Sequence, residues 1–341
     1  MSVKLTAFSK GSGCGCKLSP KILSEILIGQ TPTYFENLIV GNNTRDDAAV
    51  YQIDSTHAIV STTDFFTPIV DDPLQFGEVA ATNAVSDVYA MGAAPLMAIA
   101  ILGWPVDKIS SEVASDVVNG GREVCLRLGI PLAGGHSIQT SEPIFGLAVT
   151  GKVKLKHLKK NKSALPGDII YLTKPLGTGL VTTAQKKGCA KESHLDSVFR
   201  CMVKPNELGE VISKYPFVHA MTDVTGFGLA GHLLEICNAS NTGAEISYDA
   251  IPKFSFIEDY LEMGTIPGGT DRNWKSYGSN ITLLSDRIDY RLIADPQTSG
   301  GLLITVDSFA KKEFENIVSE VDNEVVEIGR ISDLNKKLNI S

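Results

Sequence analysis

Residues 73–102 read PLQFGEVAATNAVSDVYAMGAAPLMAIAIL, and they predict a helix followed directly by a strand. Pro73 is typical of a first helical residue, and the helical pattern continues to Met91. The apolar run from Leu96 to Leu102 then predicts a buried strand. A helix that alternates with strands in this way indicates an α/β fold.

The segments on either side extend this alternation into a first domain. Ser110 begins a further helix, which Gly120 and Gly121 should weaken. Apolar runs predict strands at Ala48–Ile53, Ala58–Val60, Ile130–Ala133 and Ile144–Val153. Together these elements form a unit of about 150 residues, which is an ordinary domain size.

A lysine-rich stretch follows this unit. Residues 154–167, KLKHLKKNKSALPG, are typical of a solvated boundary. Beyond it we expect strands at Ile169–Thr173, Val218–Met221 and Leu302–Val306, a helix at Gly226–Ala239, a loop at PGGTDRN (267–273) and a turn at DPQTSGG (295–301). The 341 residues therefore predict two α/β (α+β) domains.

Composition excludes several classes of protein. With 39 acidic and 31 basic side chains the net charge is −8, which argues against a nucleic-acid or anionic-membrane binder. No apolar run reaches the roughly 20 residues of a membrane helix, and the start does not resemble a secretory signal. The six cysteines are too sparse for a disulfide scaffold. We therefore expect reduced thiols and a cytoplasmic location.

The first motif that could carry chemistry is GSGCGCK (11–17). Its glycines let the backbone approach a phosphate, and Lys17 could bind phosphate oxygens or lower the pKa of a thiol. An unstructured tail with incidental cysteines is an equally good interpretation of the composition alone. A disulfide between Cys14 and Cys16 would be strained.

The second motif is a dispersed set of acids: Asp46 and Asp47, Asp64, Asp87, and Asp223. Mg²⁺ binds oxygen ligands and bridges to substrate phosphates through one or two carboxylates. The set therefore suggests a polyphosphate held through metal ions. Each aspartate taken singly is equally typical of a turn or a helix cap.

Two glycine-containing segments are weaker signals. Gly134-Gly135-His136-Ser137 stands at the end of a predicted strand, where a turn is the common explanation. Gly226–Gly231, GFGLAG, matches the dinucleotide-binding pattern and has Glu245 19 residues on. The polar Asp223-Val-Thr225 interrupts that pattern between its strand and its glycines.

Taken in order, these motifs resemble the selenophosphate synthetase (selenide, water dikinase) family of the aminoimidazole-ribonucleotide-synthetase-like ATP-binding superfamily. The resemblance runs from residue 11 to residue 303, and GCGCK combined with TRDDAAVY (44–51) is specific to the family. The matching segments are GSGCGCK, TRDDAAVY, STTDFF (61–66), ATNAVSDVYAMG (81–92), LAGGHSI (132–138), TKPLGTG (173–179), MTDVTGFGLAGHL (221–233), PGGTDRN and DPQTSGGLL (295–303).

The resemblance implies that ATP, selenide and water give selenophosphate, AMP and orthophosphate, with Mg²⁺ required and K⁺ stimulating. It implies that Cys14 is the catalytic thiol and that Lys17 acts near the transferred phosphoryl group. The metal ligands would be Asp47, Asp87 and Asp223. The ATP-binding positions would be Lys17, Thr44, Arg45, Asp46, Asp64, Asp87, Gly135, His136 and Ser137.

The resemblance also implies an organisation. Residues 1–20 would be a mobile glycine-rich catalytic lid, 21–155 the ATP- and Mg²⁺-binding and dimerisation domain, and 156–341 the second α/β domain. Gly135–Ser137 would reach ATP from the adjacent subunit, which implies a homodimer. The family also leaves room for a protein that delivers selenium.

Two alternatives of other classes stay open. A nicotinamide-dependent oxidoreductase would use Gly226–Gly231. A thiol carrier or metallochaperone would use Cys14 and Cys16 and would consume no ATP.

Overall fold

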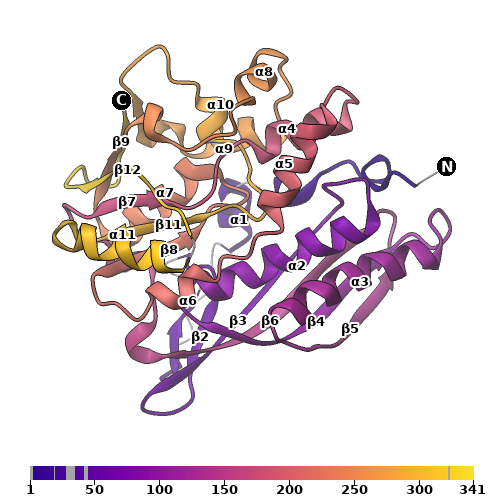
Figure 1. The fold of residues 1–341 in the computed structure, drawn as a ribbon, viewed down its shortest axis with the longest axis horizontal. Coiled ribbons are helices and arrows are strands. Elements are labelled where there is room, and N and C mark those ends of the chain that lie inside the picture. The colour runs from indigo at the N-terminus through magenta and orange to yellow at the C-terminus, as the bar shows by residue number, and fades with distance from the viewer. Residues whose placement is uncertain (1–2, 19, 28–34, 42–44, 322) are drawn as a thin grey trace.

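The computed structural model describes residues 3–18, 20–27, 35–41, 45–321 and 323–341. Its two sheets lie in two domains, and helix α2 runs between them (Figure 1). Both domains mix helices with largely antiparallel sheets, which confirms the predicted α/β (α+β) class. No helix among these residues is long and apolar enough to cross a membrane.

The first domain is a six-stranded sheet covered on one face by two helices (Figure 1). The strand order is β1-β2-β3-β6-β4-β5, and only β4 and β5 are parallel neighbours. Its elements are β1 (Leu38–Val40), β2 (Ala49–Gln52), β3 (His57–Phe66), α2 (Pro73–Ala90), β4 (Ala94–Trp104), α3 (Ser111–Arg127), β5 (Leu132–Gln139) and β6 (Ile144–Lys154). The short helix α1 (Pro20–Leu27) precedes them.

The two covering helices cross very closely at glycines. A Cβ at Gly77 of α2 would lie 1.9 Å from the carbonyl oxygen of Val117, and one at Gly120 of α3 would lie 2.0 Å from that of Leu74. α3 continues through both Gly120 and Gly121, which were expected to weaken it. Tight packing against α2 outweighs the low helix propensity of glycine.

The outer face of this sheet differs from the prediction. The strand expected to be buried, β4, leaves Leu96, Met97 and Ile99 44–45% exposed. Gly134–Ser137 lie inside β5 and not in a turn, because β5 pairs in parallel with β4 as far as Gln139. Gly135 allows this pairing, since a Cβ there would lie 2.3 Å from the carbonyl oxygen of Ala100.

The second domain contains a seven-stranded sheet in the order β10-β13-β9-β12-β7-β11-β8. Its strands are β7 (Ile169–Leu172), β8 (Val218–Asp223), β9 (Gly243–Ile246), β10 (Ile281–Leu283), β11 (Leu302–Val306), β12 (Val326–Ser332) and β13 (Leu338–Ile340). Its helices are α4 (Thr178–Lys186), α5 (Glu192–Met202), α6 (Leu208–Ile212), α7 (Gly228–Ser240), α8 (Ile257–Glu262), α9 (Gly268–Tyr277), α10 (Tyr290–Ile293) and α11 (Lys311–Glu320).

Both faces of the second sheet are covered. Along β7, Ile170 and Leu172 belong to a core that includes residues of α7, while Ile169 and Tyr171 belong to a separate core with α11. All four side chains are buried. This alternation is that of a strand buried on its two sides, so the continuous apolar run of β7 follows from its position.

Two expectations for this domain are wrong. PGGTDRN was expected to be a loop, but Gly268–Asn273 form the first part of α9; its glycines stand in the first turn, where backbone N–H groups need no helical partner. The dinucleotide-binding interpretation also fails, because β8 is an edge strand that pairs antiparallel with β11. That motif requires parallel strands in a βαβ unit.

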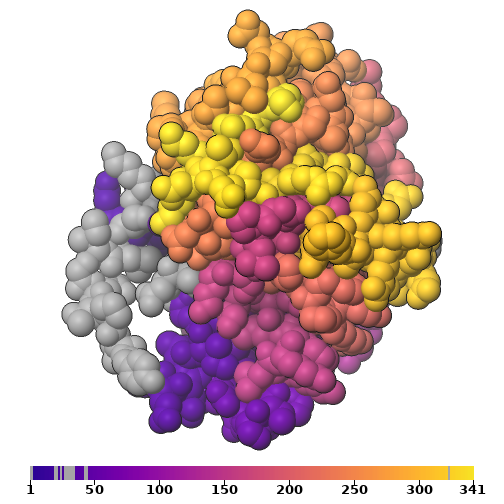
Figure 2. All heavy atoms as spheres, turned by 90° about the vertical axis from the view of Figure 1, so that its left-hand side faces the viewer, coloured from indigo at the N-terminus to yellow at the C-terminus, as the bar shows by residue number. Residues whose placement is uncertain are grey.

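The helix α2 contacts both domains. It packs on β3 and β6 of the first sheet and against β8, α5 and α6 of the second domain. Figure 2 shows the first domain in indigo and purple below the second in orange and yellow, with magenta residues of the connecting region between them. The polar residues near the end of α2 therefore lie at the junction of the domains.

Candidate active site

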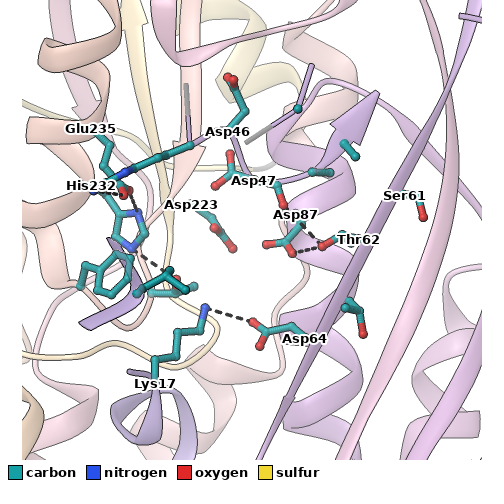
Figure 3. Close-up of a pocket in the computed structure, with 18 residues that line it drawn as sticks. Lys17, Asp46, Asp47, Ser61, Thr62, Asp64, Asp87, Asp223, His232 and Glu235 are labelled. Atoms are coloured by element: carbon teal, nitrogen blue, oxygen red, sulfur yellow. Dashed lines mark hydrogen bonds and ion pairs between the residues drawn. The ribbon is translucent and has the colours of Figure 1, made fainter. Parts of the chain in front are cut away.

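A cavity of about 490 Å³ lies at this junction (Figure 3). Six of its lining side chains are acidic, and Lys17 enters it from the glycine-rich loop. Its lining residues include Lys17, Arg45, Asp46, Asp47, Ser61, Thr62, Asp64, Asp87, Asp223, Phe227, His232 and Glu235. The cavity thus collects residues from five separate segments of the sequence.

Three aspartates converge in this cavity. Asp47 precedes β2, Asp87 lies on the last turn of α2, and Asp223 ends β8. One carboxylate oxygen from each lies within 4.8 Å of the others, which is a separation that one metal ion could span. Among the described residues, no other group of this kind is found.

Hydroxyl groups fix the three carboxylates. Thr222 donates to Asp47 Oδ1 at 2.7 Å, and Thr62 donates to Asp87 Oδ2 at 2.5 Å. Ser86 of α2 donates to Asp223 Oδ2 at 2.5 Å, so this bond crosses the domain junction. The trio is therefore preorganised by hydrogen bonds before any ligand arrives.

Burial of three neighbouring carboxylates is electrostatically unfavourable. Burial, followed by the repulsion of neighbouring carboxylates, raises the pKa of Asp47 and Asp87 well above the usual range, and burial also raises the pKa of Asp223. Asp47 Oδ2 is buried and has no hydrogen-bond partner among the described residues. These groups accordingly suit a cation, which would satisfy that oxygen and offset the repulsion.

Lys17 faces the carboxylates from the loop. Its Nζ lies 3.4 Å from Asp64 Oδ2, and Asn83 Nδ2 donates to the same carboxylate oxygen at 2.7 Å. Partial burial lowers the pKa of Lys17, but Asp64 and the other nearby acidic groups outweigh this effect and raise it. Lys17 is therefore an ammonium ion at neutral pH.

Cys14 is buried and does not line this cavity. Its Sγ donates to Asn83 Oδ1 at 3.3 Å, and its backbone N–H donates to Thr298 Oγ1 at 3.0 Å. Burial and Asp64 raise the pKa of the thiol, although Lys17 lowers it. Lys17 thus lowers the pKa of the thiol as expected, but burial and Asp64 outweigh this effect, and in this conformation Cys14 is a neutral thiol.

Hydrogen bonds to its backbone and close packing at Gly13 hold the glycine-rich loop in place. Gly13 has a positive φ of 50°, and a Cβ there would lie 2.2 Å from Ile69 Cδ1. Gly13 N–H donates to the carbonyl oxygen of Thr67 at 3.0 Å. Arg272 and Lys186 of the second domain donate to backbone carbonyls of the loop and of the residues before it, at 2.6–3.1 Å. The loop can therefore adopt this position only with glycine at position 13.

Some of the remaining expected ATP-binding residues line the cavity, and others lie away from it. Arg45 and Asp46 line the cavity, and Asp46 Oδ1 also accepts a hydrogen bond from Asn161 N–H at 2.7 Å. Thr44 lies outside the described residues. Gly135, His136 and Ser137 lie on β5, where they line a separate surface cavity. One chain thus brings Lys17, Arg45, Asp46, Asp64 and Asp87 together but not Gly135–Ser137.

Sequence reasoning missed several residues of the site. His232 Nδ1 lies 3.2 Å from Glu235 Oε2, and its ring stacks on Phe227, all three within the motif and helix of the rejected dinucleotide pattern. The hydroxyls of Thr62, Ser86 and Thr222 were also missed. A signal was present, because each hydroxyl residue stands within two positions of an aspartate singled out above.

Cys14 and Cys16 differ sharply in environment. Cys14 is buried and Cys16 is exposed, and all six cysteines are free. The described residues that could jointly hold a metal ion include neither cysteine. The geometry therefore gives no support to a metal-carrying thiol pair.

Comparison with known proteins finds two matching family models. The N-terminal domain of AIR synthase related proteins matches residues 45–153, and the C-terminal domain of the same proteins matches residues 166–338. A selenide, water dikinase of Shewanella sp. (strain MR-4) is 52% identical over 97% of this chain and 94% of the relative. One from Shewanella putrefaciens (strain CN-32 / ATCC BAA-453) is 54% identical over 92% of this chain and 89% of the relative.

Solved structures share the fold at lower identity. Thiamine-monophosphate kinase from Stenotrophomonas maltophilia K279a is 20% identical, with a TM-score of 0.66 over 94% of each chain. A chain of a HypE-HypF complex is also 20% identical, with a TM-score of 0.67 over 94% of this chain and 96% of that chain. These likenesses support the arrangement of the two domains.

Proposed function

Because this chain belongs to the AIR synthase related proteins and, within them, to the selenide, water dikinase family, we propose that it makes selenophosphate from ATP, selenide and water. AMP and orthophosphate are the other products. Selenophosphate would then serve as the selenium donor for selenocysteine and for selenium-modified tRNA. The observation that carries the proposal is the convergence of three aspartates and Lys17 in one cavity.

The aspartate trio fits Mg²⁺. Its donors are all oxygen atoms, and the unpartnered Asp47 Oδ2 offers a ligand that nothing described in the chain satisfies. Asp47, Asp87 and Asp223 would hold the ion between the domains, and K⁺ would stimulate the reaction. When bound, Mg²⁺ offsets the negative charge of phosphate oxygens.

Lys17 would bind the phosphoryl group that is transferred. Its ammonium group enters the cavity beside Asp64, where it can exchange one anionic partner for another. Arg45, Asp46, Asp64 and Asp87 would contact ATP, and Thr44 belongs to the same expected set. The positive charge of Lys17 stabilises charge that develops on the phosphoryl oxygens.

Cys14 would present selenium to the activated phosphate. In the present conformation its thiol is neutral, faces Asn83, and is removed from solvent. Hiding the thiol protects it from oxidation, and exclusion of water also protects a reactive phosphoryl group. The loop of residues 1–20 would therefore act as a lid that opens for selenium and closes for transfer.

A homodimer is part of the proposal. The outer face of the first sheet exposes Leu96, Met97, Ile99 and Ile138 by 44–58%. Apolar patches of this kind are typical of protein interfaces. A second copy on this face would cover these side chains, and it would bring Gly135–Ser137 of one subunit toward the other. We also propose a cytoplasmic setting, where the six free cysteines stay reduced.

Phosphorus NMR of ATP, Mg²⁺ and anaerobic selenide with the protein tests the reaction. We expect a selenium-coupled phosphorus signal that grows in step with AMP. ADP as the stable end product would contradict the proposal. Stoichiometric NADH binding, or stoichiometric metal held by Cys14 and Cys16 without consumption of ATP, would instead favour one of the other two classes.

A further inference from the structure

A second cavity, of about 220 Å³, adjoins the same glycine-rich loop. Gly11, Ser12 and Gly15 line it, whereas Lys17 lines the aspartate cavity, and the two cavities share no lining residue. Residues of α4, of the start of α9 and of the turn at Pro296–Thr298 form most of the remaining walls, together with Lys10 and Ile69. The loop that carries Cys14 thus stands between two separate cavities.

The two cavities have opposite charge. Six acidic side chains and two basic ones line the aspartate cavity. Lys10, Lys186 and Arg272 line the second cavity, and none of its described lining residues is acidic. Two acidic residues outside the lining set contact it: Glu142 accepts a hydrogen bond from Lys10 N–H at 3.2 Å, and Asp295 Oδ2 accepts one from Gly179 N–H at 3.0 Å. A small anion is therefore repelled by the first cavity and attracted by the second.

Donors for an anion remain in the second cavity. Arg272 uses Nη2 to bind the carbonyl oxygen of Gly15, and the described residues occupy no other of its five N–H donors. Gly268 and Gly269 stand in the first turn of α9, where backbone N–H groups lack intrahelical partners. The three cationic side chains and these N–H groups form a lining suited to an anion.

The second cavity adjoins the backbone of Cys14. Thr298, which is 1% exposed, lines the cavity and accepts the hydrogen bond from Cys14 N–H at 3.0 Å. Gly15, the residue after Cys14, also lines it. A volume of 220 Å³ is below the range of about 300–1,000 Å³ that is usual for larger ligands, so the cavity suits a small ion rather than a nucleotide.

We propose that the second cavity is the entrance by which the anionic selenium substrate, hydrogenselenide, approaches Cys14, apart from the cavity that takes ATP. This inference rests on the proposed function, since it assigns a route to one of the two substrates. Negative selenide and negative ATP then reach the loop from different cavities. The arrangement avoids the repulsion that a shared acidic entrance would impose on selenide.

Thr183 offers a test that leaves the contacts holding the glycine-rich loop intact. It lines the second cavity on α4, and the described contacts include no hydrogen bond from its hydroxyl. Thr183→Glu adds a negative charge there, and Thr183→Gln is the neutral control of equal size. We expect Thr183→Glu to raise KM for selenide about tenfold and Thr183→Gln to raise it less than twofold. In both variants KM for ATP and the melting temperature should stay unchanged.

The outcome separates this inference from the proposed function. Equal KM values for selenide in the two variants, at unchanged KM for ATP, would overturn the entrance while selenophosphate formation stands. Absence of selenophosphate from the unmodified protein would overturn the function itself, and that measurement requires neither variant. A higher salt concentration should also reduce the difference between the variants, because the effect is electrostatic.

Discussion

The aspartate trio and the glycine-rich loop form the two halves of one site, but they are held in different ways. The aspartates stand beside or at the ends of β2, α2 and β8, and hydroxyl groups of neighbouring elements fix their carboxylates. The loop is held mainly through its own backbone, by Thr67, Thr298, Lys186 and Arg272. The difference teaches that side-chain hydrogen bonds at the domain junction fix one half, while mainly backbone contacts hold the other.

The largest expected effect is on the loop half. Cys14→Ser should lower selenophosphate formation by about 10⁴-fold or more, because it removes the proposed selenium-presenting thiol. Lys17→Ala should likewise abolish the reaction. Binding of ATP, measured by calorimetry, should weaken less than threefold in Cys14→Ser, since Cys14 does not line the ATP cavity.

Cys16→Ser is the matched control, because Cys16 is exposed. We expect a much milder loss of activity. Alkylation followed by mass spectrometry should modify Cys16 well before Cys14, since burial raises the pKa of the Cys14 thiol. Full activity in Cys14→Ser would remove the assignment of this thiol.

The next effect is on the aspartate half. Asp87→Asn should lower activity by about 10³-fold while raising the melting temperature of the metal-free protein by about 2 °C, because it relieves buried repulsion. Mg²⁺ should raise the melting temperature of the unmodified protein but not of the variant. Asp54→Asn, at an exposed carboxylate, should leave activity unchanged. An unaltered response to Mg²⁺ in Asp87→Asn would contradict the metal assignment.

A smaller effect should follow from disturbing the packing that holds the glycine-rich loop in place. Gly13→Ala forces a Cβ against Ile69 and Thr298, so we expect activity to fall by about 10- to 100-fold. The melting temperature should fall by about 4 °C or less, since no core strand is involved. Gly264→Ala is the control: its φ is +65°, but a Cβ there meets nothing within 4 Å. Equal loss of activity in both variants would show that backbone strain alone, and not the packing of the loop, lowers activity.

The smallest effect concerns the turn that supports the loop. Burial raises the pKa of Asp295 to about 8. The folded protein therefore keeps a proton that the unfolded chain loses above about pH 4, so the contribution of this group to stability falls as pH rises from about 4 to 8. Asp295→Asn should flatten this dependence by up to about 1.4 kcal/mol per pH unit in urea unfolding. Parallel curves for the two proteins would rule out this role of Asp295.

The sequence predicts the helices and strands that follow local periodicity better than those decided by contacts with distant segments. The helix expected at Pro73–Met91 is α2, and the strand expected at Val218–Met221 is β8 with two further residues. Both follow local periodicity, which a single segment carries. The helix at PGGTDRN and the strand through Gly134–Ser137 were missed, because packing against Pro296 and pairing with β4 decide them.

The same holds for the candidate site. Dispersed aspartates suggested a metal site, and three of them do converge. The raised pKa of Cys14 could not be foreseen, since it depends on burial and on Asp64 of β3. Burial by distant elements reverses the effect that the neighbouring Lys17 has on the thiol.

The position of α2 limits how the chain can be divided. Ala90 belongs to the core of the second domain, and a Cβ at Gly209 of α6 would lie 2.3 Å from the carbonyl oxygen of Tyr89. A fragment ending near residue 155 would therefore expose a face of α2 that is apolar and shaped for α6. Expression of either half alone should give an aggregation-prone product, and fusions or truncations should leave α2 with both of its neighbours.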